Sequence, residues 1–231
     1  MKKNYSLLLI AFLFALVSGY GQSDVLISQY IETNSGTTPK GIEIFNISGA
    51  DIVFTATNNL LIHQGTNGGS CNAIGATSIT SGTLKANEVW VIGTSDLTGF
   101  ATTNGTGLSG TLVHNFTFNG DDALQVYLGG TLQDVFGTCG SDPGSSWNTG
   151  GVNTSNNNLQ IKNGICDGDL NGWTDPSERF DEIANGSTMT GFGNPPTSCS
   201  PTSDLEITGT PTDHGSLCVG TPGSTVQYTI T

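Results

Sequence analysis

The stretch TFNGDDALQVYL, residues 117–128, is the starting point for predicting the fold. Asn119-Gly120 lies between two runs of strand-like residues, and both residue types tolerate the positive φ that a type I′ hairpin turn requires. Gly129-Gly130 then forms a second tight turn before a third run at 131–137. The stretch therefore predicts a three-stranded meander whose first strand ends at Phe118.

Short strand-like runs separated by turn residues continue along the chain, a pattern typical of a sandwich or barrel. Residues 94–110 are rich in Gly, Thr and Asn and are expected to form a loop. No segment longer than about ten residues has convincing helical periodicity. The sequence therefore predicts an all-β domain of about 170 residues, large enough to bury a core. Further strands are expected at residues 25–31, 42–47, 60–64, 88–92, 112–118 and 158–162.

Residues 1–21 have the pattern of a secretory signal peptide. Lys2 and Lys3 are followed by an apolar run at 7–17 and a zone of mostly small residues at 18–21. The apolar run is too short for a membrane anchor, which needs about 20 residues. We predict that the segment is removed, that no transmembrane segment remains, and that the mature protein is secreted, extracellular or at the cell surface.

The charge of the chain argues against nucleic acid as a direct partner. The net charge is −13, and removal of Lys2 and Lys3 leaves four basic residues against 19 acidic ones, which gives −15. Affinity for nucleic acid comes mainly from Lys and Arg that displace counterions, so direct binding is not expected.

Residues 195–203 contain three prolines, are otherwise mostly polar, and are predicted to be a linker. They separate a predicted domain at 22–194 from residues 204–231, which contain two further strand-like runs. These 28 residues are too few for a core of their own. We therefore interpret 204–231 as the truncated start of a second β-sandwich module, and the chain as a fragment of a longer protein.

Five cysteines in an exported chain favour disulfides over catalytic thiols. Cys139 and Cys166 border the glycine-rich segment 140–164 and are predicted to pair. The odd number leaves at least one cysteine unmatched within this chain, and the sequence assigns no partners to the remaining three, Cys71, Cys199 and Cys218.

Two groups of motifs resemble a lamin-tail domain in its bacterial, exported form. The first is VLISQYIE at 25–32 followed by KGIEIFN at 40–46, and the second is FNGDDAL at 118–124 followed by DVFG at 134–137. Trp147 and the run NLQIK at 158–162 fall where that family has a tryptophan loop and a closing strand. The resemblance covers roughly residues 24–193.

The resemblance implies an immunoglobulin-like β-sandwich without catalytic residues. Bacterial members of the family often stand beside extracellular nucleases, phosphatases or adhesive repeats, which they are thought to tether or present. The predicted function is a non-catalytic binding or tethering module, whose partner is a cell-envelope or extracellular polymer or a fused downstream domain. Two alternatives stay open: the accessory domain of an extracellular nuclease- or phosphatase-type hydrolase whose catalytic domain is missing from this chain, and a calcium-dependent adhesin module.

The segment DGDLNG at 167–172, with two acids further on, fits the formula of a calcium-binding loop. Its oxygens would occupy positions 1, 3, 5, 9 and 12 around the ion. A strand and a cysteine precede it, where an EF-hand would have a helix. Alternatively, Asp175 caps a short helix that begins at Pro176. Calcium is the only cofactor that the sequence suggests, and its candidate ligands are Asp167, Asp169, Asn171, Asp175 and Glu178.

Other polar residues have structural and functional interpretations. Asp121 and Asp122 could form a metal or catalytic pair, but adjacent strand residues point to opposite faces, and Asp at a turn commonly accepts from local backbone N–H groups. Glu43, between two isoleucines, is either solvent-facing or a buried acceptor that ties down a loop, and the resemblance favours the second.

No catalytic motif is found in the sequence. There is no nucleophile elbow, phosphate-binding loop or zinc-ligand spacing, so the protein is predicted not to be an enzyme. The histidines, His63, His114 and His214, show no ligand pattern, and His63 and His114 are expected to be ordinary sheet residues. The tryptophans, Trp90, Trp147 and Trp173, could stack on sugars but are expected to pack in the core.

Overall fold

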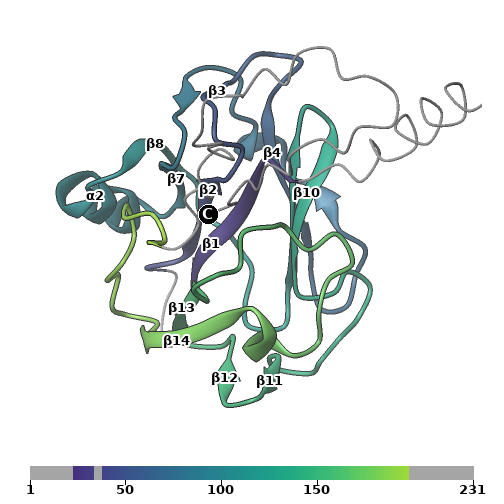
Figure 1. Ribbon diagram of the computed structural model, residues 1–231. Helices are drawn as coiled ribbons and strands as arrows, with labels where there is room; N and C mark the ends of the chain where they lie inside the picture. The colour runs from purple at the N-terminus through teal and green to yellow at the C-terminus, as the bar shows by residue number, and fades with distance from the viewer. Residues whose placement is uncertain (1–22, 34–37, 198–231) are drawn as a thin grey trace, which may run out of the picture.

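The computed structural model of this chain describes residues 23–33 and 38–197. Two main sheets are present, one of six strands in the order β14-β13-β1-β2-β7-β8 and one of four in the order β10-β9-β4-β5. Figure 1 shows the six-stranded sheet beside α2, with β4 and β10 on the opposite side. The predicted signal peptide and residues 198–231, which include the predicted second module, lie outside the described residues.

The six-stranded sheet is formed by β1 (Val25–Ile31), β2 (Gly41–Asn46), β7 (Val89–Gly93), β8 (Leu108–Val113), β13 (Asn157–Ile161) and β14 (Phe180–Asn185). The four-stranded sheet is formed by β4 (Leu60–Gly65), β5 (Asn72–Ala73), β9 (Ala123–Leu128) and β10 (Thr131–Phe136). The remaining elements are β3 (Ile52–Val53), η1 (Gly75–Thr77), β6 (Thr83–Leu84), α2 (Ser95–Asn104), β11 (Asn148–Thr149), β12 (Val152–Asn153) and η2 (Pro176–Glu178).

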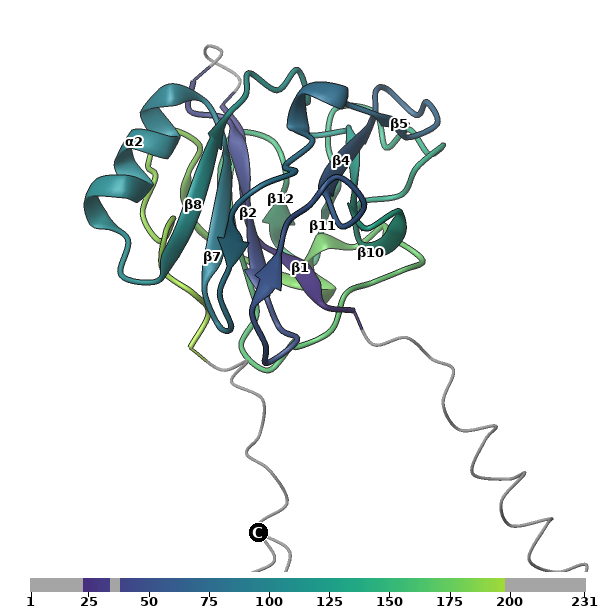
Figure 2. The ribbon, with the colours of Figure 1, turned by 90° about the horizontal axis from the view of Figure 1, so that it is seen from above.

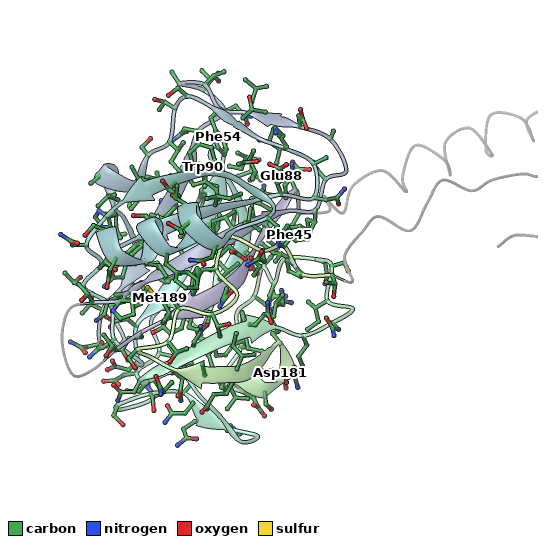
Figure 3. The ribbon with its side chains drawn as sticks, turned by 90° about the vertical axis from the view of Figure 1, so that its left-hand side faces the viewer. Phe45, Phe54, Glu88, Trp90, Asp181 and Met189 are labelled. Carbon is green, nitrogen blue, oxygen red and sulfur yellow. A yellow bond between two sulfur atoms is a disulfide. The ribbon has the colours of Figure 1, made fainter. Side chains whose placement is uncertain are left out.

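A single large hydrophobic core lies between the two main sheets. Ile27 and Ile44 of the six-stranded sheet belong to the same buried cluster as Ile62 and Val126 of the four-stranded sheet. Aromatic rings extend this core; Figure 3 labels Phe54 and Trp90, whose ring centroids are 5.3 Å apart in an edge-to-face contact. The prediction of an all-β sandwich is therefore confirmed.

The second face of the six-stranded sheet is covered by α2 and by residues 186–195. A smaller apolar cluster joins Ile31 and Val91 of the sheet to Leu97 of the helix and to Phe192. Seen from above in Figure 2, β8, β7, β2 and β1 lie side by side, with α2 next to β8. The central strands β1, β2 and β7 are therefore buried along their whole length, whereas the edge strands β8 and β14 are partly exposed.

The hairpin predicted around Asn119-Gly120 is wrong. Neither residue has a positive φ, and Asp122 N donates to Asn119 O at 3.1 Å in a simple four-residue turn. The strand expected at 112–118 is instead β8, which begins at Leu108, ends at Val113 and pairs with β7 in the other sheet. Phe118 is buried in the core without belonging to a strand.

The tight turn predicted at Gly129-Gly130 is confirmed. The two φ angles are 56° and 80°, as a two-residue turn of the I′ type requires, and the turn joins β9 to β10 as antiparallel partners. The other neighbour of β9 is β4, which is not adjacent in sequence, so the predicted three-stranded meander is correct for its last two strands and wrong for its first. The strands predicted at 25–31, 42–47, 60–64, 88–92 and 158–162 are all present within one residue of their expected bounds.

The loop predicted at 94–110 is also wrong, because it contains α2 and the start of β8. The helix contains three Thr and one Gly and has only a narrow buried side, formed by Leu97, Thr98 and Ala101. It connects β7 to β8, which run parallel, and parallel neighbours need such a crossover. Packing against the sheet thus stabilises a helix that the sequence pattern did not predict.

Candidate functional site

Two of the predicted calcium ligands, Asp167 and Asp169, make hydrogen bonds to other residues of the segment 167–179. Asp169 Oδ1 accepts from the backbone N–H groups of Asn171 and Gly172 at 2.8 and 3.0 Å. Asp167 offers its backbone carbonyl to Arg179 at 2.7 Å. Across the described residues, no group of three or more His, Cys, Asp or Glu side chains is placed to hold a metal ion. Calcium binding stays a prediction, and the geometry of this segment does not support it.

The alternative for the second half of that segment, a helix cap, is confirmed. Asp175 Oδ1 accepts from the backbone N–H and the hydroxyl of Ser177 at 2.9 and 2.7 Å. Pro176 occupies the first position of a 3₁₀ turn that ends at Glu178. The carboxylate therefore satisfies N–H groups that a helix start leaves unpaired.

Asp134 of β10 holds residues 167–179 against the two sheets. Its Oδ1 accepts from Asp169 N at 2.7 Å and lies 3.6 Å from Arg179 Nη2. Its Oδ2 accepts from Ile27 N of β1 at 2.7 Å. The other strand beside β1, β13, pairs only with residues 29–31, so the side chain of Asp134 takes an N–H that β13 does not reach. We call Asp134, Arg179 and these donors the Asp134 junction.

Burial dominates the protonation of Asp134. Desolvation raises the pKa of its carboxyl to about 6, although Arg179 and the backbone donors act in the opposite direction. The carboxylate and the guanidinium are almost fully buried. Removing one member of such a pair costs more than the pair contributes, because the other charge is left without compensation.

Glu43 of β2 is the second buried acid that ties a distant segment to the sheet. Its Oε1 accepts from Ser28 Oγ at 2.7 Å and its Oε2 from Gly193 N at 2.6 Å. Its two paired neighbours across the sheet are Gln29 and Val91. The interpretation of Glu43 as a buried acceptor that ties down a loop is confirmed. We call Glu43, Ser28 and Gly193 the Glu43 junction.

Two amides extend the Glu43 junction along the same C-terminal segment. Gln29 Nε2 donates to Asn158 Oδ1 and to Thr190 O, both at 2.7 Å. Asn158 Nδ2 in turn donates to Thr188 O and Thr190 O. Residues 188–193 are therefore fixed on the sheet by side chains of three different strands. Desolvation raises the pKa of Glu43 to about 8, against the lowering effect of its two donors.

The pair Asp121-Asp122 lies in the turn between β8 and β9 and is buried. Asp122 accepts from the backbone N–H groups of Asn67 and Asn119 at 2.8 and 3.1 Å, as expected for Asp at a turn. Desolvation raises the pKa of Asp122, and Asp121 adds to the increase. Asp121 Oδ1 is buried and has no hydrogen-bond partner. The geometry therefore gives Asp122 a structural role in the turn, and places no hydrogen-bonding base or nucleophile against Asp121 Oδ1.

Lys40 supplies the positive charge next to this turn. Its Nζ lies 3.6 Å from Glu32 Oε1, donates to Phe118 O and sits 5.7 Å from the centre of the Phe118 ring. Glu32 Oε2 also accepts from Asn156 N at 2.7 Å. These contacts connect the segment between β1 and β2 to the turn that follows β8, so the charges of Lys40 and Glu32 have a structural role.

The predicted disulfide between Cys139 and Cys166 is wrong. Cys139 is bonded to Cys71, with a Cα–Cα separation of 5.6 Å, and Cys166 is disulfide-bonded as well. The observed bond joins the end of β10 to the start of β5, where Gly140 N also donates to Gly69 O. The glycine-rich segment was therefore a poor guide, because the pairing depends on which loops the fold brings together.

The tryptophans and the described histidines are structural. Trp90, Trp147 and Trp173 are all buried in the main core, which confirms their interpretation as packing residues. His63 lies in β4 and stacks on Tyr127 at 4.2 Å. His114 directly follows β8 and is not itself a strand residue, and His214 lies outside the described residues.

Sequence reasoning missed Asp134, Arg179, Gln29 and Asn158 as residues that organise the molecule. One signal was available: Arg179 is the only arginine in the sequence, and arginine is the preferred cation for buried ion pairs. The partner of Arg179 lies far away in sequence, so the pair itself had no local signature.

Comparisons with known proteins identify no family. A scan against protein-family models finds no match, and searches of curated proteins and of solved structures find no significant similarity. Within the described residues, none of the helices has the length and apolar character needed to cross a membrane.

Proposed function

We propose that this protein is an exported, non-catalytic module of the lamin-tail type that binds or tethers. Its partner is a cell-envelope or extracellular polymer, or a domain fused downstream. The observation that carries the proposal is the use of the buried acids. Glu43, Asp122 and Asp134 each accept from backbone N–H groups of distant segments. These buried acids therefore connect segments of a scaffold and do not form a reactive site.

The disulfide supports the exported part of the proposal. Cys71, just before β5, and Cys139, in the turn after β10, are bonded, and structural disulfides persist mainly in oxidising compartments. The strongly acidic composition is compatible with an extracellular partner that is not anionic. Together with the signal pattern at residues 1–21, these features favour secretion or display at the cell surface.

The lamin-tail assignment and the immunoglobulin-like type of the sandwich rest on the sequence resemblance. One feature of the fold agrees with what the resemblance implied for an individual residue: the buried role of Glu43. One feature differs from an immunoglobulin sandwich, whose sheets are antiparallel: β7 and β8 are parallel and are joined through α2.

Binding can be tested with the purified mature chain and envelopes isolated from the cells that make it. The chain should sediment with intact envelopes or with their purified polysaccharide, and heat-unfolded chain should serve as the control for non-specific association. Recovery of all folded protein in the supernatant, with both materials, would contradict the tethering function.

Absence of catalysis can be tested on the same preparation. Phosphodiesters, esters and glycans should remain intact at every pH between 5 and 9. Turnover that is abolished by Asp121→Asn would show that the unpartnered carboxyl of Asp121 is catalytic. The matched variant Asp51→Asn, which changes an exposed acid, would control for the change in charge.

A further inference from the structure

The surface hollows of the molecule differ in whether their polar side chains already have partners. One hollow, of about 570 Å³, lies beside the turn from β9 to β10, and its lining includes Ser23 and Asn58. Ser23 Oγ donates to Gln133 O at 2.6 Å, and Asn58 Nδ2 donates to Val53 O at 3.0 Å. These two side chains are therefore already used to hold the fold together.

A second hollow, of about 410 Å³, has polar side chains that the protein does not use in this way. It lies between the loop after β10, the strand β11 and Thr174, at the lower end of the view in Figure 1. We call it the Trp147 hollow. None of its uncharged polar side chains is hydrogen-bonded to another described residue. These side chains are Ser141, Ser146, Asn148, Thr149 and Thr174.

Trp147 is the buried residue of this lining. It is only 2% exposed, and its six-membered ring packs so closely on Gly137 that a Cβ there would collide with it. Its Nε1 is buried and has no hydrogen-bond partner in the part of the chain that the structure describes. A buried donor without an acceptor is destabilising. An oxygen acceptor bound in the hollow would therefore supply a partner that the protein does not.

The segment that carries the hollow is fixed at both ends. At its start, Cys139 is bonded to Cys71, and the next residue, Gly140, donates its N–H to the backbone of the neighbouring loop at 3.1 Å. At its end, Trp147 N donates to Thr154 Oγ1, and Thr154 N donates back to Trp147 O, both at 3.1 Å. A site whose walls are already held in place loses little conformational entropy when a ligand binds.

The chemistry of the lining points to an uncharged ligand rich in hydroxyl groups. None of the residues that line the hollow is charged. The two acids next to it in sequence, Asp142 and Asp175, each accept from a nearby backbone N–H, and their charge disfavours an anionic ligand. Hydroxyl side chains both donate and accept, and the amide of Asn148 does the same. Sugar hydroxyls also have both capacities, so they can satisfy such a lining.

We propose that the Trp147 hollow binds one sugar unit of a neutral polysaccharide, and that Trp147 Nε1 donates a hydrogen bond to a sugar oxygen. The proposal rests on the proposed function and names the class of extracellular polymer. A protein partner fits less well, because protein interfaces typically bury about 800 Å² on each side around an apolar core. The lining of this hollow consists mostly of hydroxyl and amide groups.

The test uses polysaccharide purified from the envelopes of the cells that make the protein and separated by anion exchange into a neutral and an anionic fraction. The mature chain should bind the neutral fraction in affinity electrophoresis. Ser146→Ala combined with Thr149→Val removes two hydroxyls from the lining and should raise the Kd about tenfold, which corresponds to about 1.4 kcal/mol. Thr57→Val is the matched control, because it removes an exposed hydroxyl beside the other hollow and should leave the Kd unchanged.

A second measurement reports on the indole directly. The chain has three tryptophans, so a nitrogen-15 spectrum with assigned signals contains three indole N–H peaks. The neutral fraction should shift the peak of Trp147 and leave that of Trp90, which lies in β7, in place. A shift of the Trp90 peak without a shift of the Trp147 peak would place binding elsewhere on the molecule.

The outcomes separate this proposal from the tethering function. A chain that binds intact envelopes or the anionic fraction, but not the neutral fraction, would overturn the sugar site and leave tethering intact. Equal Kd values for the wild type and the double variant, both with unchanged melting curves, would also overturn the site alone. A chain that binds none of these materials would overturn tethering and the sugar site together.

Discussion

The Glu43 and Asp134 junctions both connect a strand to a distant segment through a buried acid, but only the Asp134 junction contains a cation. Each places a buried carboxylate of one strand against the backbone N–H of a segment more than a hundred residues away: Gly193 for Glu43 and Ile27 for Asp134. Asp134 also faces Arg179, whereas among the described residues no cation pairs with Glu43. Burial raises the pKa of Glu43 to about 8 but that of Asp134 only to about 6.

The difference shows how a cation changes the cost of a buried acid. Glu43 is mostly protonated at neutral pH, so its junction is held by hydrogen bonds of a neutral group. Asp134 is mostly ionised, so its junction contains two opposite charges out of water. Loss of a partner should therefore be tolerated better at Glu43, because no isolated buried charge remains there.

The largest expected effect comes from Asp134→Ala. The change leaves the guanidinium of Arg179 buried and removes the acceptor of two backbone N–H groups, so it should lower the free energy of unfolding by about 3–5 kcal/mol. Urea unfolding at pH 7 measures this loss. Asp134→Ala combined with Arg179→Met should recover part of it; a double variant no more stable than Asp134→Ala would contradict the role given to the ion pair.

A smaller loss is expected from Glu43→Ala. The hydroxyl of Ser28 and the N–H of Gly193 lose their acceptor, which should cost about 1–3 kcal/mol. Glu43→Gln is the matched control, since an amide resembles the protonated carboxyl and should retain most of the stability at pH 7. Equal losses for the alanine and glutamine variants would mean that Glu43 is ionised, and the contrast with Asp134 would disappear.

The pH dependence of stability distinguishes the junctions in the wild-type protein. An acid with a raised pKa keeps its proton longer in the folded state, so stability falls as pH rises between the unfolded and folded pKa values. The windows are about 4.5 to 8 for Glu43 and about 3.8 to 6 for Asp134. Above pH 6 the decline should come from Glu43, with a slope of at most about 1.4 kcal/mol per pH unit.

Glu43→Gln provides the control for this measurement. The variant should lose the decline between pH 6 and 8, and the comparison cancels His63 and His114, whose pKa values are lowered by burial. Urea midpoints that fall equally in both proteins over this range would show that another group is responsible.

The smallest effect is expected at Asp175, a half-buried carboxylate whose partner is only two residues away. Asp175→Ala should cost about 1 kcal/mol, as the loss of a helix cap does. The cost should be the same in millimolar calcium and in chelator. Melting curves in which calcium stabilises the wild type, and Asp167→Ala removes that effect, would instead restore the calcium site predicted from the sequence.

Local signals in the sequence were reliable where neighbouring residues decide the structure. Short runs of strand-forming residues bounded by turn residues located β1, β2, β4, β7 and β13 within one residue, because this pattern depends only on neighbouring residues. Gly129-Gly130 and Asp175-Pro176 were interpreted correctly for the same reason: a positive φ and a helix cap depend on a few adjacent residues. The hairpin predicted at Asn119-Gly120 was wrong because the strand before it ends at Val113 and pairs with β7 in the six-stranded sheet.

The sequence by itself determined the all-β class, seven of the main strands including β9 and β10, the turn between those two strands, and the cap at Asp175. Only the tertiary structure decided the parallel pairing of β7 with β8, the helix α2, the bond from Cys71 to Cys139 and the contact of Asp134 with Arg179. The physical reason is distance along the chain. These features depend on which surfaces pack together. Packing brings together residues that are far apart in sequence, and the local sequence around one residue does not reveal its distant partner.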